Sequence, residues 1–194
     1  MPYQFSFKSD DYPSFKCPLK RSQCEHINPR TGKQCRRKQY IGFNLCFQHL
    51  ATDNNLKIKQ SSIEGAGKGL FAYNGSTDNN DTVFTGTRDK GQRIVDYNGD
   101  VLSISQLEKR FGDHTAPYTV RINKGLVEDA SCRRSAGSLA NHNSKANAKL
   151  YAYQGRVYLR ATKNIKNGQE ITVDYGDEYD LDEEGVSHTT KYVR

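Results

Sequence analysis

Three cysteines and one histidine near the start of the chain have the types and the spacing of a metal site. Cys24, Cys35 and Cys46 follow one another with ten residues between neighbours, and His49 comes three residues after the last. Thiolates and an imidazole are the ligands of closed tetrahedral zinc sites. Cys46 and His49 are one helical turn apart, so a short helix would present both to one ion. The spacing therefore predicts a Cys3His zinc site that supplies most of the folding free energy of this segment.

Two alternatives remain for the cysteine segment. Cys17 or His26 could replace one ligand, or the thiols could be free on a loop. The segment resembles small Cys3His fingers of some chromatin-associated proteins. Cationic side chains interleave with the ligands, and they either contact nucleic-acid phosphate or only keep the finger soluble. These side chains are Arg30, Lys33, Arg36, Arg37 and Lys38.

Four further motifs follow in order along the chain. The first is the glycine-rich stretch EGAGKGLFA at 64–72, and the second is YNGDVLS at 97–103. The third joins Asp129-Ala130 to SLANHNSKAN at 138–147, and the fourth is GQEITVDYG at 168–176. A glycine-rich loop alone indicates only a tight turn. No βαβ unit follows it, so it is not a dinucleotide fingerprint.

Together these motifs resemble the SET-domain family of protein lysine methyltransferases, over residues 56–179. The Asn-His pair, its distance from Asp-Ala and the later Asn147 match the family pattern R-F-x-N-H-S-x-x-P-N. Three positions depart from it, because Ser138, Asn143 and Ala146 stand where the family has Arg, Ser and Pro. No cysteine follows Cys132, so the cysteine triad that closes the lysine channel in many members is absent. Tyr179 or Tyr192 could supply that wall.

The resemblance implies methyl transfer from S-adenosylmethionine to a lysine amine. The amine must be neutral, and a dry channel lowers its pKa by disfavouring the cation. Alignment of the nitrogen, methyl carbon and sulfur in one line then supplies most of the rate enhancement. The resemblance implies that Tyr175 is the catalytic tyrosine. It also implies that the methyl donor is bound by Lys68, Gly69, Leu70, Tyr118, Asn141, His142 and Tyr175.

Each of these residues also has a structural interpretation. Tyr175 could be a core strand aromatic, His142 a satisfied buried histidine and Tyr118 plain packing. The competing function is an inactive SET-fold module that the zinc segment recruits to chromatin or nucleic acid.

Charge is unevenly distributed along the chain. Residues 1–52 hold nine Lys/Arg and three Asp/Glu, which is +6 of the net charge of +7. Such asymmetry indicates either an acidic partner or only a solvated basic surface without one. Seven acids lie between Asp174 and Glu184, where they either attract a basic lysine peptide such as a histone tail or only keep the tail solvated. We therefore expect a nuclear or chromatin-associated protein, otherwise a cytoplasmic one. No apolar run predicts a membrane span.

The elements that must position these residues are mostly short strands. The resemblance implies a mostly β SET fold of several small sheets with a threaded, pseudoknot-like C-terminal segment. We expect a zinc-binding segment at 1–52, a SET domain at 53–179 and an acidic tail at 180–194. Residues 51–55 are expected to form a linker, and residues 103–111 a helix with Ser103 or Ser105 as its N-cap. The cysteines are expected to be reduced thiols or metal ligands. Strands are expected on either side of the glycine loop and at 93–97, 118–122, 125–129, 155–161 and 170–175.

Overall fold

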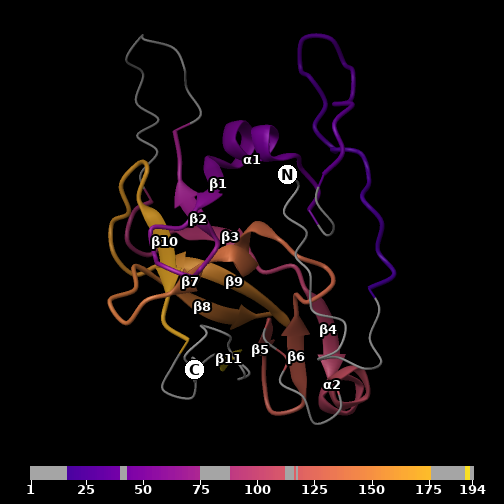
Figure 1. The fold of residues 1–194 in the computed structure, drawn as a ribbon, viewed down its shortest axis with the longest axis vertical. Coiled ribbons are helices and arrows are strands. Elements are labelled where there is room, and N and C mark those ends of the chain that lie inside the picture. The colour runs from indigo at the N-terminus through magenta and orange to yellow at the C-terminus, as the bar shows by residue number, and fades with distance from the viewer. Residues whose placement is uncertain are drawn as a thin grey trace.

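The computed structural model describes residues 17–39, 43–74, 88–111, 116, 118–175 and 191–192. Residues 1–16, the polar loop after Asn74 and the acidic stretch from Gly176 to Thr190 lie outside the described residues, as does the side chain of Tyr192. Two sheets form the body, the N-terminal segment runs along one side of it, and helix α1 lies at the end that carries β1 (Figure 1). The fold class is mostly β, as expected. The elements are α1 Phe47–Asn54, β1 Leu56–Gln60, β2 Lys68–Ala72, β3 Arg93–Asp96, β4 Asp100–Ser103, α2 Ile104–Phe111, β5 Thr119–Arg121, β6 Leu126–Asp129, η1 Ala136–Leu139, β7 Asn141–His142, β8 Ala148–Tyr153, β9 Arg156–Ala161, β10 Glu170–Val173 and β11 Lys191–Tyr192.

The larger sheet has the strand order β1-β2-β10-β8-β9-β3, and β7 pairs with β10 beside this path. Strands β8 and β9 form an antiparallel hairpin in which buried and exposed side chains alternate. Leu150, Val157 and Leu159 face the core from this hairpin. All four residues of β10 are buried, because neighbouring strands and loops cover both faces of this central strand.

The smaller sheet has the order β11-β5-β6-β4 and carries α2. Ser103 precedes α2 and accepts a hydrogen bond from the backbone N–H of Gln106 at 3.2 Å, as expected of the N-cap. Glu128 of β6 joins the two sheets, because its buried carboxylate accepts the backbone N–H of Val157 in β9 at 2.7 Å. Burial raises the pKa of Glu128, although the Val157 N–H and the Arg156 guanidinium oppose this.

The N-terminal segment contains little regular structure. Two isolated antiparallel bridges, Gln23↔Lys38 and Ile27↔Gln34, close a loop ahead of α1. The expected linker at 51–55 is wrong, because α1 continues to Asn54 and ends at Asn55, which has a left-handed backbone. Asparagine tolerates that conformation at a helix C-terminus. In the described residues no helix is long and apolar enough to cross a membrane.

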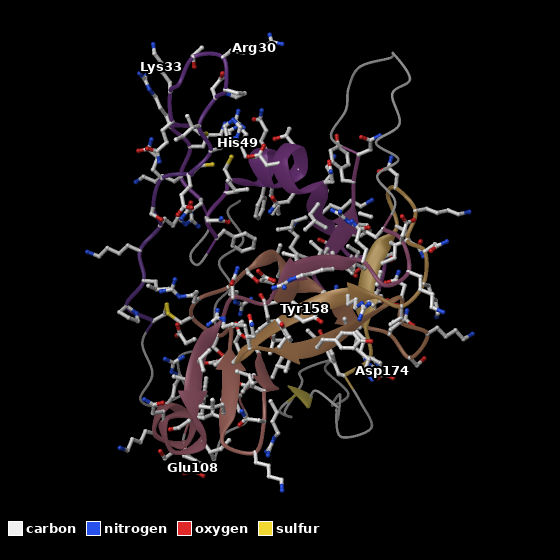
Figure 2. The ribbon with its side chains drawn as sticks, turned by 180° about the vertical axis from the view of Figure 1, so that it is seen from behind. Arg30, Lys33, His49, Glu108, Tyr158 and Asp174 are labelled. Carbon is white, nitrogen blue, oxygen red and sulfur yellow. A yellow bond between two sulfur atoms is a disulfide. The ribbon has the colours of Figure 1, made fainter. Side chains whose placement is uncertain are left out.

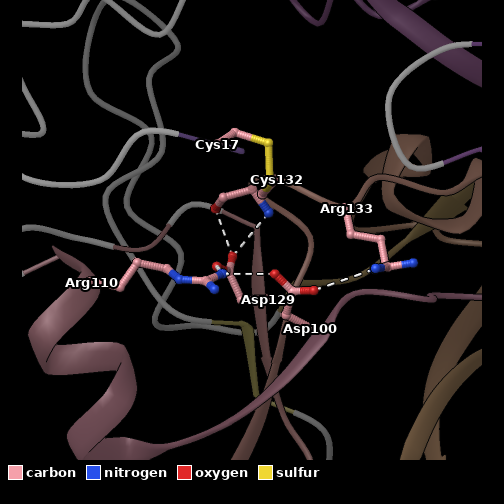
Figure 3. Close-up of a disulfide and its surroundings, with 7 residues drawn as sticks. Cys17, Asp100, Arg110, Asp129, Cys132 and Arg133 are labelled. Atoms are coloured by element: carbon pink, nitrogen blue, oxygen red, sulfur yellow. Dashed lines mark hydrogen bonds and ion pairs between the residues drawn. A yellow bond between two sulfur atoms is a disulfide. The ribbon is translucent and has the colours of Figure 1, made fainter. Parts of the chain in front are cut away.

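A disulfide between Cys17 and Cys132 corrects the expectation that the cysteines are only thiols or metal ligands. It joins positions 115 residues apart, so sequence spacing carried no signal of it. Figure 3 shows the bond beside the carboxylate of Asp129, which accepts a hydrogen bond from Arg110 of α2 at 2.7 Å. The disulfide therefore ties the start of the N-terminal segment to the body of the protein.

Candidate functional site

The structure brings the four expected metal ligands together. One ligand atom from each of Cys24, Cys35, Cys46 and His49 lies within 4.8 Å of all the others. The Nδ1 atom of His49 is 3.4 Å from the sulfur of Cys24 and 3.5 Å from that of Cys46. Ordinary Zn–S and Zn–N bonds at tetrahedral angles require an S–N separation of about 3.6 Å. The donor set and its spacing therefore fit a zinc ion.

The two alternative ligands have other contacts. Cys17 is in the disulfide, and His26 stacks on the ring of His49 with centroids 3.6 Å apart while its Nδ1 lies 2.6 Å from the carboxylate of Asp53. Burial raises the pKa of Cys24. Burial also acts to raise the pKa of Cys46, but hydrogen bonds outweigh it and lower that pKa. Burial lowers the pKa of His49, which favours the neutral imidazole that binds metal.

A second cluster of expected site residues gathers around β10. β7 runs parallel to β10, with Asn141 opposite Thr172 and His142 opposite Val173. These are the two segments that the resemblance expects to be threaded through each other. Just after β10, the backbone N–H of Tyr175 donates to Nδ1 of His142 at 3.2 Å. The rings of His142 and Tyr175 lie 5.3 Å apart, so β10 positions the histidine and the tyrosine together.

Asn141 links this cluster to the glycine-rich loop. Its amide nitrogen donates to the carbonyl of Lys68 and to the carboxylate of Glu170, both at 3.1 Å. Leu70 is fully buried, and its strand pairs with β1 on one side and β10 on the other. Segments around residues 68, 141 and 175, far apart in the sequence, therefore meet at one place.

Glu170 is a positioning residue that the sequence reasoning did not identify. Its carboxylate accepts hydrogen bonds from the hydroxyls of Ser61 and Ser62 and from the Ser62 backbone N–H, at 2.6 to 2.8 Å. Burial acts to raise the pKa of Glu170, but these donors outweigh it and lower that pKa. A Cβ at Gly69 would lie 2.2 Å from the same carboxylate. Glycine is thus required there, and Glu170 holds the loop from Ser61 to Gly69 against β10.

The hydroxyl of Tyr175 donates to the carbonyl of Ala140 at 2.7 Å, and the side chain is buried. Tyr118 packs against the same core. The guanidinium of Arg134 lies 3.9 Å from the centre of the Tyr118 ring. The backbone carbonyl of Tyr118 accepts a hydrogen bond from the hydroxyl of Tyr97.

A cleft of about 790 Å³ lies elsewhere, between α1 and the edges of β3 and β4. None of the expected donor residues lines it. Its arginines have partners, since Arg93 pairs with Asp96, Arg133 with Asp100 and Arg156 with Glu128. Arg88 donates to the carbonyls at the end of α1. The cleft therefore lies where the segment at 43–54 meets the edges of β3 and β4, and its arginines are already paired within the protein.

Comparison with known proteins identifies the fold around the second cluster. The SET domain family matches residues 83–176. This match assigns residues 83–176 to a SET domain. The N-lysine methyltransferase KMT5A-A of Danio rerio is 31% identical over 128 residues, which cover 59% of this chain and 34% of that protein. The histone-lysine N-methyltransferase ASHR3 of Arabidopsis thaliana is 33% identical over 91 residues, which cover 42% and 18%.

A solved structure supports the fold alone. A chain of an active polycomb repressive complex 2 in the stimulated state aligns with a TM-score of 0.51 and 23% identity, over 71% of this chain and 17% of that one. This chain spans about a third of the length of the first curated relatives that it matches. The match therefore assigns a SET domain to residues 83–176, whereas the roles of single residues rest on the geometry described above.

Proposed function

We propose that this protein is a protein lysine N-methyltransferase that uses S-adenosylmethionine. The observation that carries the proposal is the meeting of Lys68, Asn141, His142 and Tyr175 around β10. These are positions that the SET resemblance assigns to the methyl donor. Relatives named as lysine methyltransferases support the same reaction.

In the proposed reaction the neutral amine of the substrate lysine attacks the methyl carbon of the sulfonium. The carbon–sulfur bond breaks as the carbon–nitrogen bond forms, and the sulfur keeps the electron pair. The ammonium proton leaves to water before the attack. The chain supplies alignment and a dry environment, which together lower the barrier.

Each side chain of the cluster has a proposed part in this reaction. The hydroxyl of Tyr175, held by the Ala140 carbonyl, lies at the junction of donor and lysine. His142 and Asn141 hold the adenine and amino-acid portions of the donor. The backbone of Lys68, Gly69 and Leu70 contacts the donor, and Glu170 keeps that backbone in place. Tyr118 lines the donor pocket.

We further propose zinc in the Cys3His cluster, a histone lysine as acceptor and a nuclear or chromatin location. The ligand distances fit zinc. The basic segment 1–52 acts as the zinc-binding segment, residues 53–179 as the SET domain and 180–194 as an acidic tail. Relatives named as histone-lysine methyltransferases support the substrate class.

The decisive test replaces Tyr175 by Phe in the full, zinc-loaded chain. Only one hydroxyl is removed, so donor binding by calorimetry should stay within about twofold, while methyl transfer should fall by roughly 100-fold or more. Tyr97→Phe is the matched control, because Tyr97 is also buried and donates its hydroxyl to a backbone carbonyl. This variant should lose similar stability, and because its hydroxyl contacts the backbone of Tyr118 rather than the catalytic residue itself, it should retain far more activity than Tyr175→Phe.

Two outcomes would overturn the proposal. Full activity of the Tyr175→Phe variant would move the catalytic role to another residue. An unmodified protein that binds no S-adenosylmethionine and methylates no histone or other protein would favour the inactive binding module.

A further inference from the structure

The outer face of the β3-β9-β8 sheet carries tyrosines interleaved with cations. Alternation along β8 and β9 places Val157, Leu159 and Leu150 in the core and sends the intervening side chains outward. The register puts Lys149 opposite Arg160 and Tyr151 opposite Tyr158. We define this tyrosine–cation face by its members on the three strands, which are Arg93, Lys149, Tyr151, Tyr153, Tyr158 and Arg160.

The aromatic rings of this face are accessible and ordered. Tyr153 is 61% exposed, and Tyr151 and Tyr158 are half-buried. The rings of Tyr151 and Tyr158 lie 5.8 Å apart and only 21° from parallel. Figure 2 shows Tyr158 on the sheet, which is drawn without a covering helix on that side. The face therefore combines two adjacent, nearly parallel rings that are partly accessible with the exposed ring of Tyr153.

The cations of the face are arranged around these rings. The guanidinium of Arg93 lies 4.5 Å from the centre of the Tyr158 ring, and that of Arg160 lies 5.7 Å from the Tyr151 ring. Asp96 pairs with Arg93. Lys149 and Arg160 form no ion pair with any acid in the described part of the chain. Positive charge without a matching acid indicates an anionic partner.

We propose that the tyrosine–cation face binds single-stranded nucleic acid. Aromatic rings offer a stacking surface to unpaired bases, and flanking cations contact the phosphates. Guanidinium planes can stack on bases as well. An acidic peptide would use the cations but not the rings, and a duplex keeps its bases away from a flat protein surface. The face is separate from the metal cluster and from the site around β10, so this proposal does not depend on methyl transfer.

The test measures fluorescence anisotropy of a labelled oligo-dT or oligo-U strand titrated with the full, zinc-loaded chain. Replacing both Tyr151 and Tyr158 by Thr removes the rings but keeps β-forming residues, and should weaken binding about tenfold or more. Replacing both by Phe is the matched control, because it keeps the rings, and should change affinity less than about twofold. Circular dichroism and thermal melting verify that each variant is folded.

A second pair of variants tests the charges. Lys149→Gln with Arg160→Gln should weaken binding and reduce its salt dependence, since each lost phosphate contact removes about 0.7 from the slope of log affinity on log salt. Lys109→Gln with Lys124→Gln removes the same charge from exposed positions off the face and should have a smaller effect.

Several results would overturn the proposal. These are an oligonucleotide that does not bind at micromolar protein, unchanged affinity of the Tyr→Thr variant, or equal losses from the two charge pairs. A duplex or poly-glutamate that binds as well as the single strand, independently of the rings, would also overturn it.

Discussion

The Cys/His segment and the sheets that follow it contrast in what holds them together. Residues 17–54 contain one helix and two isolated bridges, and the loop between Cys24 and Cys35 is mostly exposed, with Ile27 at 61%. Residues 56–175 contain strands β1 to β10, most of whose aliphatic side chains are buried, and Phe43, Leu45 and Leu50 of the segment pack against the edge of this core. A metal can replace a hydrophobic core in a short segment, so the comparison predicts that the two regions respond to different perturbations.

The largest expected effect is loss of the metal. Structural zinc contributes roughly 10–16 kcal/mol of binding free energy in small zinc peptides. A chelator, or Cys35→Ser, should therefore remove one zinc per chain and open residues 17–52 to protease, while the sheets keep their melting transition. Metal analysis and limited proteolysis measure this. Cys17→Ser should retain the zinc, and zinc content unaffected by Cys35→Ser would contradict the ligand set.

A substitution in the hydrophobic core of the sheets should lower stability without removing the metal. Leu159 of β9 is fully buried, so Leu159→Ala should cost about 2–5 kcal/mol of unfolding free energy. Zinc content should stay the same. Ile27→Ala, at an exposed position, should change the unfolding free energy by less than about 0.5 kcal/mol. Urea denaturation with metal analysis checks both, and loss of zinc from the Leu159 variant would show that the regions fold as one unit.

The disulfide is a covalent cross-link between the regions, in addition to the backbone at Asn55. It joins two residues that are 115 positions apart in the sequence, and such a bond restricts the unfolded chain. Cys17→Ser should therefore lower the unfolding free energy by about 2–4 kcal/mol. Cys17 is exposed and Cys132 is buried, so the change at Cys17 leaves no core cavity. Reductant should destabilise the unmodified chain by the same amount and leave the variant unchanged. Equal stability in the presence and absence of reductant would argue against the bond.

The smallest expected effect concerns Glu170. A glutamine nitrogen cannot accept the N–H of Ser62, so Glu170→Gln should cost about 1–3 kcal/mol at neutral pH. Because the pKa of Glu170 is lowered in the folded state, its carboxylate stabilises the fold above the unfolded value near 4.5. That contribution is lost as pH falls through the lower folded pKa. Urea denaturation of both proteins across this range should show the difference shrinking in acid, and a constant difference would exclude this linkage.

Several elements were predictable because their signals are local. The strands at 93–96, 126–129, 156–161 and 170–173 are β-branched or aromatic runs bounded by turn residues. β8 was missed, because Ala148, Lys149 and Ala152 are poor strand formers, and its pairing with β9 supplies the order instead. β7 is only two residues long and exists through parallel pairing with β10, which no local pattern reveals.

The sequence by itself determined the metal ligands as a candidate set and the SET resemblance, because both depend on residue types at short spacings. Only the tertiary structure decided that Cys17 pairs with Cys132, that the predicted linker is helix, and that Glu170 binds Ser61 and Ser62. These contacts join residues that are more than 100 positions apart, except within α1. A contact of that kind depends on the path of the whole chain. Hydrophobic burial along the strands sets that path, and the two residues in contact do not.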